Sequence, residues 1–232
     1  MRKTCLDTLH QLAKRDPRVL YLGSDPGAGT LDAMKAELPG QFFVEGIAEA
    51  NIIGMAAGMA MEGYIPYVNT IATFLTRRCF EQIAIDLCLQ NLPVRLIANG
   101  GGLVYAPLGP THTAIEDIAI MRSLPGMTVV AVADAEEMQR FMLQSLDWPG
   151  PIYIRLGKGG EPVISRPDDE FRIGQAILAR KGWTSDNNPK ILLISTGVMT
   201  ARALKAADEL DATVLHMPTL KPLDTVGLFQ AA

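Results

Sequence analysis

The chain has 232 residues, 48% of them hydrophobic and 20% charged, which suits one large or two ordinary domains with a sizeable core. Its net charge of -4 argues against nucleic acid or an anionic membrane as a partner. Three cysteines with no CxxC or metal-ligand spacing favour a reduced, cytoplasmic location and no metal site in this chain. No apolar stretch approaches the ~20 residues that span a bilayer.

From the N-terminus to residue 155, helical periods alternate with short β-rich runs. Helices are expected at 4–14, 49–61, 74–89, 115–122 and 135–146. Strands are expected at 19–22, 42–44, 65–70, 94–98, 127–132 and 152–155. This alternation predicts an α/β fold in which helices cover both faces of a parallel sheet.

The pattern changes near residue 160. Residues 161–189 carry clusters of proline, glycine and charge, which predict a linker with a hairpin-like lead-in. A strand, a helix and a strand of a second α/β lobe are then expected at 191–195, 199–210 and 213–217. So few strands predict an incomplete lobe, either because the chain is truncated after Ala232 or because a partner completes it. The expected organisation is a domain at 1–160, the linker, and a partial domain at 190–232.

Glu49 lies in the first turn of an otherwise apolar helix of small residues. One interpretation is that its carboxylate complements the helix dipole, and position alone favours this. The other is a carboxyl that keeps its proton against buried surface and works in acid–base chemistry. Asp25, the triple glycine at 100–102, His112 and Arg155 also lie in loops after predicted strands, where parallel sheets place functional groups. Their convergence favours the second interpretation.

Two further side chains leave alternatives open. His112 lies on a glycine-started turn, where it can donate a proton, bind a substrate oxygen or be structural. Arg155 ends a buried strand, so it requires either a phosphate or carboxylate ligand or a local acid. His10 and His216 are expected to be structural, because they lie on a packed helix and a core strand.

Several short motifs occur in one order, at 46–49 (GIAE), 56–58 (AAG), 73–75 (TFL), 109–112 (GPTH) and 125–127 (PGM). Together they resemble the pyrimidine-binding domain of the transketolase-type thiamine diphosphate enzymes. The resemblance runs from the first residues to about Gly160. The segment from Ile191 resembles the beginning of that family's C-terminal domain.

The resemblance implies thiamine diphosphate as cofactor and gives roles to individual residues. Glu49 would bond the aminopyrimidine ring nitrogen and relay a proton, so its protonated form is expected to prevail. Phe74 would stack on the pyrimidine, and Asp25 would be a loop acid near the cofactor. His112 and Arg155 would contact the ketose or its phosphate. Further phosphate-side positions fall at Arg2 and Arg77.

The substrate side departs from sugar-using relatives at three positions. Leu108 stands where these relatives have an acid, Gly100 stands at about the position of their substrate-binding histidine, and Ile71 stands where they have an aromatic residue. The pocket is therefore expected to be less polar toward sugar hydroxyls. A modified, branched or less hydroxylated ketose, still phosphorylated, is the expected substrate.

The family's diphosphate-binding domain, with its metal motif, is absent from this chain. The resemblance therefore implies the second subunit of a split transketolase, which transfers a two-carbon ketol unit from a ketose to an aldehyde. An N-terminal-section subunit would hold Mg²⁺ or Ca²⁺, and this chain would form a homodimer within a heterotetramer. Alternatives are an enzyme like 1-deoxy-D-xylulose-5-phosphate synthase, a 2-oxo acid dehydrogenase β-like subunit, and a catalytically silent regulatory paralogue. The presence of Glu49 weighs against the last.

Overall fold

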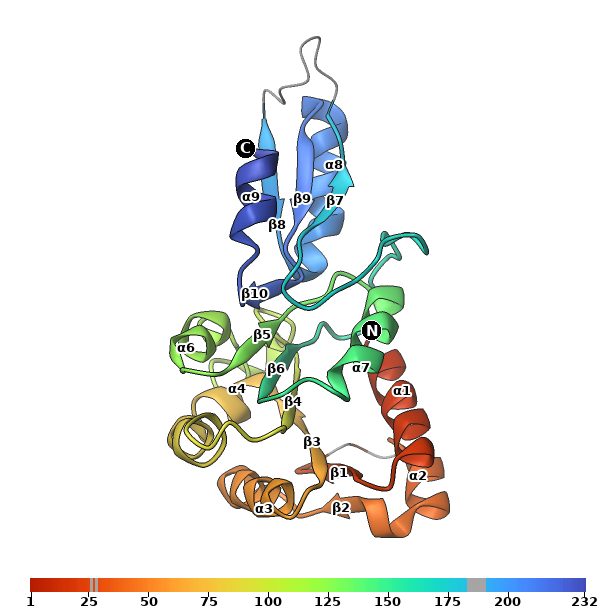
Figure 1. Ribbon diagram of the computed structural model, residues 1–232, viewed down its shortest axis with the longest axis vertical. Helices are drawn as coiled ribbons and strands as arrows, with labels where there is room; N and C mark the ends of the chain where they lie inside the picture. Colours follow the sequence, from red (N-terminus) through yellow and green to blue (C-terminus); the bar gives the residue numbers. More distant parts are fainter. Residues whose placement is uncertain (26, 28, 183–190) are drawn as a thin grey trace.

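The computed structural model describes residues 1–25, 27, 29–182 and 191–232 (Figure 1). Its α-helices are α1 (Arg2–Arg15), α2 (Asp32–Glu37), α3 (Glu49–Met61), α4 (Ala72–Thr76), α5 (Phe80–Gln82), α6 (Asp117–Ser123), α7 (Ala135–Ser145), α8 (Thr200–Leu210) and α9 (Thr225–Ala231). Short 3-10 turns are η1 (Pro39–Gln41), η3 (Ala106–Leu108) and η4 (Gly197–Met199), and η2 (Ile83–Cys88) is a π-helical turn. The strands are β1 (Val19–Gly23), β2 (Phe42–Val44), β3 (Ile65–Ile71), β4 (Arg95–Asn99), β5 (Thr128–Val130), β6 (Ile152–Arg155), β7 (Ile177–Arg180), β8 (Leu192–Ser195), β9 (Thr213–His216) and β10 (Thr219–Lys221).

A seven-stranded sheet in the order β10-β5-β6-β4-β3-β1-β2 organises the larger part of the molecule. Neighbouring strands pair in parallel except for β10, which runs antiparallel to β5. The inner strands are buried on both faces, because helices cover the sheet on both sides. The expected α/β fold with a mostly parallel sheet is confirmed.

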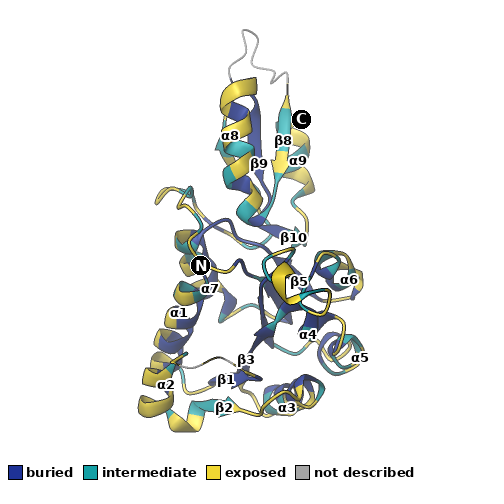
Figure 2. Cartoon of the chain, turned by 180° about the vertical axis from the view of Figure 1, so that it is seen from behind, coloured by how far each residue is buried: buried dark blue, intermediate teal, exposed yellow. Residues whose placement is uncertain are grey.

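Two hydrophobic cores lie on opposite faces of this sheet. Helices α1, α2 and α7 cover one face, and α3, α4 and α6 cover the other (Figure 1). The helices turn their buried sides toward the sheet and their exposed sides outward (Figure 2). Because every βα loop crosses the same edge, the residues after β1, β2, β3 and β4 meet at the carboxyl ends of the strands.

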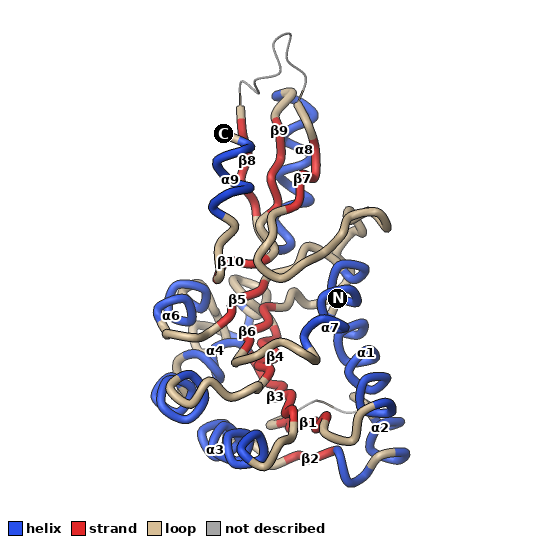
Figure 3. The backbone as a smooth tube through the Cα atoms, viewed as in Figure 1, coloured by secondary structure: helices blue, strands red, loops and turns tan. Residues whose placement is uncertain are grey.

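The C-terminal lobe has a three-stranded sheet of its own, in the order β7-β9-β8 (Figure 3). The chain then returns to the larger sheet as β10, where Lys221 pairs with Val129. His216 joins the two parts, because its Nε2 lies 3.0 Å from a carboxylate oxygen of the buried Glu137. The tail thus forms a small sheet and also extends the larger one, which the count of predicted strands did not anticipate. The elements α2, α9, β7 and β10 were not predicted.

One predicted helix is wrong. The expected helix at 74–89 begins earlier, at Ala72, ends at Thr76, and resumes at Phe80 before the π-helical turn. Cys79 leaves the helical conformation (φ -117°, ψ 17°), and its thiol bonds the Phe74 carbonyl oxygen. Hydrophobic periodicity could not predict this break, because the break depends on tertiary contacts of Arg77 and Arg78.

No helix among the described residues is long and apolar enough to cross a membrane.

Candidate functional site

Glu49 occupies the meeting point of two loops at the carboxyl edge of the sheet. It begins α3 after a turn in which Gly46 has φ +71°, a conformation that favours glycine. Its side chain is 1% exposed. Ser24, the residue after β1, donates a hydrogen bond of 2.7 Å to Glu49 Oε1. Arg78 donates one of 2.6 Å to Oε2, so both carboxylate oxygens have partners.

These partners set the ionisation of Glu49. Burial raises the pKa of its carboxyl, but hydrogen bonds from Ser24, Arg78 and the backbone, with the charge of Arg78, together lower it by more, so the net pKa is below its usual value. In this chain alone the ionised form is therefore favoured, and the expectation that the protonated form prevails beside the pyrimidine stays a prediction. The helix-terminus acid is a buried carboxylate with a cationic partner.

Phe74 and His112 lie beside this pair. The Arg78 guanidinium covers the Phe74 ring, with Cζ 4.3 Å from the ring centroid. His112 meets the same ring edge-on, with centroids 5.1 Å apart. The structure therefore brings Glu49, Phe74 and His112 into one cluster, with Arg78 in its centre.

The loop that carries His112 is held by α4 and by Arg77. Thr73 donates a 2.8 Å hydrogen bond to the Thr111 carbonyl oxygen. Arg77 donates to the carbonyl oxygens of Pro110 and Thr113, at 2.8 and 2.9 Å, and pairs with the Glu116 carboxylate. These contacts give Arg77 a positioning role, and its predicted phosphate contact stays a prediction.

Arg155 has a local acid partner, one of the two alternatives left open by the sequence. Its Nε lies 2.7 Å from Asp117 Oδ2, which also accepts a 2.9 Å hydrogen bond from Tyr153. Asp117 is 1% exposed and the Arg155 side chain 20%. A Cβ at Gly101 would lie 2.5 Å from Arg155 Nε, so the glycine is required for the guanidinium to lie here. The exposed part of the Arg155 side chain remains accessible to a ligand.

Asp25 and Arg2 lie outside the Glu49–Phe74 cluster. Asp25 is exposed on the loop directly after Ser24, where its Oδ1 accepts a hydrogen bond from the Gly27 backbone N–H. Arg2 lines a separate 510 Å³ cavity together with Lys3 and Lys158. Their predicted roles toward cofactor and phosphate stay predictions.

Sequence reasoning missed Ser24, Asp117 and Arg78. Two adjacent arginines are by default solvated surface, and the Arg78 side chain is indeed 46% exposed. The one available signal was that Arg77 and Arg78 follow the TFL motif after a single residue, Thr76. A position in the sequence cannot reveal that the two guanidinium groups reach different loops.

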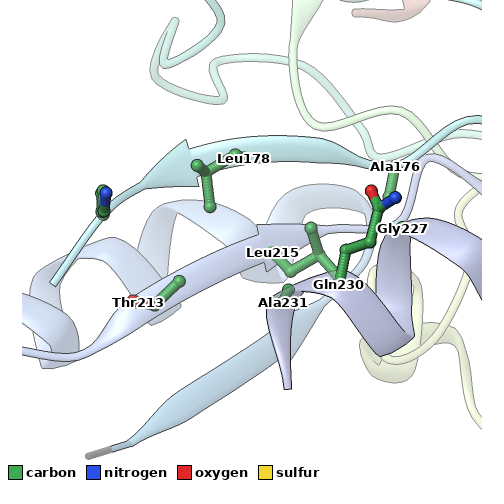
Figure 4. A pocket seen from close by; sticks show the side chains of 8 residues that line it. Ala176, Leu178, Thr213, Leu215, Gly227, Gln230 and Ala231 are labelled. Atoms are coloured by element: carbon green, nitrogen blue, oxygen red, sulfur yellow. The ribbon is translucent and has the colours of Figure 1, made fainter. Parts of the chain in front are cut away.

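A second cavity, of 390 Å³, lies in the C-terminal lobe between β7, β9 and α9 (Figure 4). Leu178, Leu215 and Gln230 are among its lining residues. None of the predicted site residues lines it.

Comparison with known proteins identifies the family. Residues 1–161 match the transketolase pyrimidine binding domain, and residues 181–232 match the transketolase C-terminal domain. The chain belongs to the transketolase family. Members of this family use thiamine diphosphate, and the transketolase-type resemblance is thereby confirmed.

Relatives of this transketolase-family chain include subunits of split enzymes. The 6-deoxy-6-sulfo-D-fructose transketolase subunit SqwH of Clostridium sp. (strain MSTE9) is 34% identical over 238 residues, covering 100% of this chain and 72% of that protein. A solved split-gene transketolase, described as an inactive beta4 tetramer, matches with a TM-score of 0.88 and 34% identity, covering 100% of this chain and 75% of that one. The 1-deoxy-D-xylulose-5-phosphate synthase of Microcystis aeruginosa (strain NIES-843 / IAM M-2473) is 37% identical over 235 residues, which cover 97% of this chain and 36% of that protein.

Proposed function

We propose that this chain is one subunit of a thiamine-diphosphate transketolase that moves a two-carbon ketol unit from a ketose phosphate to an aldehyde. The observation that carries the proposal is that one guanidinium, that of Arg78, bonds the buried Glu49 carboxylate and covers the face of the Phe74 ring. These residues fit an aminopyrimidine, since a planar nitrogen donor, the Arg78 guanidinium, already satisfies both of them. Thiamine diphosphate, when bound, supplies the carbanion chemistry.

The chain's own residues would orient the cofactor and handle one proton. Glu49 would hold a proton at the pyrimidine ring nitrogen, with Ser24 fixing the orientation of its carboxyl group. Phe74 would offer its ring face for stacking, and Asp25 would line the approach to the cofactor. Because Glu49 is buried, water would not reach this proton, and the proton would pass only between the carboxyl group and the ring nitrogen.

His112, Arg155, Arg77 and Arg2 would serve the substrate. His112 lies against Phe74, so its ring is placed to bond a substrate oxygen near the reacting carbon. Arg155 and Arg2 would meet the anionic end of the ketose, and Arg77 would hold the His112 loop in position.

The shape of the loop after β4 supports a substrate that is less hydroxylated at one end. Gly100 has φ +76°, and a Cβ there would overlap the Tyr105 ring, so Tyr105 fills the place of a side chain at Gly100. Leu108, 59% exposed, adds apolar surface on the same loop. SqwH is named for a sulfonated fructose. A ketose with an anionic end group is therefore the substrate class that we propose.

We further propose a heteromeric assembly in the cytoplasm, in which a diphosphate-binding N-terminal-section subunit holds Mg²⁺ or Ca²⁺ and two copies of this chain associate. The outer face of α3 supports an interface, because Gly54 and Gly58 are exposed and a Cβ added at either would have open space for 4 Å around it. Ile47, 73% exposed beside Glu49, adds apolar surface at the same end of the helix. All three cysteines are buried and free, which suits a reducing compartment.

The test is co-expression with a candidate N-terminal-section subunit, followed by a ketol-transfer assay on fructose 6-phosphate and 6-deoxy-6-sulfofructose. Glu49→Gln should abolish transfer while the complex still assembles, and Glu136→Gln, on exposed α7 surface, should retain it. Retained transfer in Glu49→Gln would refute the proposal, and silence of the native complex on every ketose would favour the regulatory paralogue. The identity to the synthase favours one rival activity, which formation of 1-deoxy-D-xylulose 5-phosphate would reveal.

A further inference from the structure

Arg78 occupies the same two contacts that an aminopyrimidine would need. Its Nη1 donates to Glu49 Oε2 at 2.6 Å, and its planar guanidinium lies 4.3 Å from the centroid of the Phe74 ring. A protonated or amino-substituted ring and a guanidinium are alike in this respect, because both are planar, both donate N–H groups and both stack on aromatic faces. The side chain therefore fills the acid-plus-aromatic site from within the chain.

We propose that Arg78 is a built-in stand-in for the aminopyrimidine, which seals the site in the unassembled subunit and is displaced when the cofactor binds. The proposal deepens the proposed function and rests on it. It assigns Arg78 a regulatory role, setting how tightly the subunit takes the cofactor before assembly.

The local structure allows the displacement. Arg78 is 46% exposed, so its guanidinium can move into water without crossing packed side chains. It lies in the non-helical turn between α4 and α5, where Cys79 has already left the helical conformation. Arg77 is tied to the Pro110 and Thr113 carbonyl oxygens, so the neighbouring loop stays in place when Arg78 moves.

The exchange also changes the pKa of Glu49. The titratable side chains that face Glu49 in the described chain are Arg78 and Cys79, while Ser24 contributes a neutral hydroxyl. Burial raises the pKa of the Cys79 thiol to about 12, and the charge of Glu49 raises it too, so this thiol stays neutral. When Arg78 leaves, Glu49 loses one hydrogen bond and one positive charge that lower its pKa, so the pKa rises. The stand-in thus holds the pKa of Glu49 lower than it is after the exchange.

The first measurement is binding of 4-aminopyrimidine to the full chain, followed by NMR chemical shifts. Arg78→Met, which keeps most of the side-chain volume, should bind about three- to thirty-fold more tightly than the native chain, since one partly exposed ion pair and one cation–π contact no longer compete. Arg78→Lys, which keeps the charge without the planar face, should fall between them. Arg202→Ala, on exposed helix α8, controls for the loss of one positive charge and should match the native chain.

The second measurement is the ¹³C titration of the Glu49 carboxyl without ligand. In Arg78→Met the pKa of Glu49 should rise above its native value, a readout independent of turnover. Equal or weaker binding by a folded Arg78→Met, or an unmoved Glu49 titration, would overturn the stand-in role. If Glu49→Gln binds the ring as well as the native chain does, the proposed function fails and the stand-in with it. Weakened binding in Glu49→Gln, together with an unaffected Arg78→Met, refutes only the stand-in.

Discussion

Asp117→Asn tests whether the acid under Arg155 is a structural necessity of the fold. The carboxylate accepts hydrogen bonds from Arg155 Nε at 2.7 Å and Nη2 at 3.3 Å, and from Tyr153 at 2.9 Å. Asparagine keeps the volume but removes the charge, and it turns an N–H group toward one of these donors. The substitution therefore isolates the electrostatic part of the interaction from packing.

The expected loss of stability follows from burial. Removing one partner of a buried pair costs about 3–5 kcal/mol, because the other charge is left without compensation. Arg155 is 20% exposed, so water restores part of that loss, and the amide oxygen of asparagine still accepts one hydrogen bond. We expect a loss of about 2–3 kcal/mol. For a chain of this length that corresponds to a fall in Tm of roughly 4–12 °C.

Urea unfolding, followed by circular dichroism at pH 7, gives the free energy of unfolding directly. Glu170→Gln is the matched control, because it breaks an exposed pair with Arg172 and should change stability by less than about 0.5 kcal/mol. A loss below about 1 kcal/mol for Asp117→Asn would refute the reasoning. It would mean that Arg155 is solvated in solution and free to bind an anion unaided.

Three further substitutions test separate parts of the structure. Ser24→Ala should raise the pKa of Glu49 in a ¹³C titration, since a hydrogen bond that favours the carboxylate is lost, and an unchanged titration would contradict the 2.7 Å contact. Gly100→Ala should lower the free energy of unfolding in urea by about 1–3 kcal/mol, because its Cβ clashes with the Tyr105 ring and its backbone is strained. In the double variant with Tyr105→Ala the clash should be relieved while the backbone strain remains. Additive losses of stability in the double variant would refute the clash. Asp134→Asn should flatten the acid side of the stability–pH curve. In the native chain, hydrogen bonds outweigh burial and lower the pKa of Asp134. The stability that Asp134 contributes is therefore present above its unfolded pKa of about 3.9 and is lost as the pH falls through its folded pKa. An acid limb as steep as that of the native chain would contradict this.

The alternation of elements could be predicted because local patterns determine it. The apolar runs of β1, β3 and β4 and the small-residue helix α3 follow from residue type and spacing alone. The π-helical turn after α5 and the antiparallel pairing of β10 could not, because each depends on contacts between distant segments. Strand β10 has three residues, too few for a pattern, and it is ordered by pairing with β5.

The candidate site divides in the same way. Glu49, Phe74 and His112 were predicted from ordered motifs, and the structure brings them together, although their roles in catalysis stay predictions. Arg78, the partner of Glu49, and Asp117, the partner of Arg155, could not be predicted, since a salt bridge across 29 or 38 residues leaves no local trace in one sequence. The lowered pKa of Glu49 in this chain alone could not be predicted for that reason, because the guanidinium beside it was not considered.

The arginines Arg77, Arg78 and Arg155 of the candidate site each have an acid partner inside the chain, and burial ranks how readily each pair can exchange. Arg78 is the most exposed of the three arginines in these pairs, at 46%, and Arg77 follows at 43%, but Arg77 is also bonded to two carbonyl oxygens. Arg155, at 20%, lies over an acid that has no other cation within bonding distance among the described residues. A ligand that competes for Glu49 therefore exchanges with Arg78 at little cost, whereas an anion at Arg155 must join Asp117 rather than replace it. We therefore expect the proposed site to take the pyrimidine by substitution and the substrate's anionic end by addition, so salt should weaken the second step more than the first.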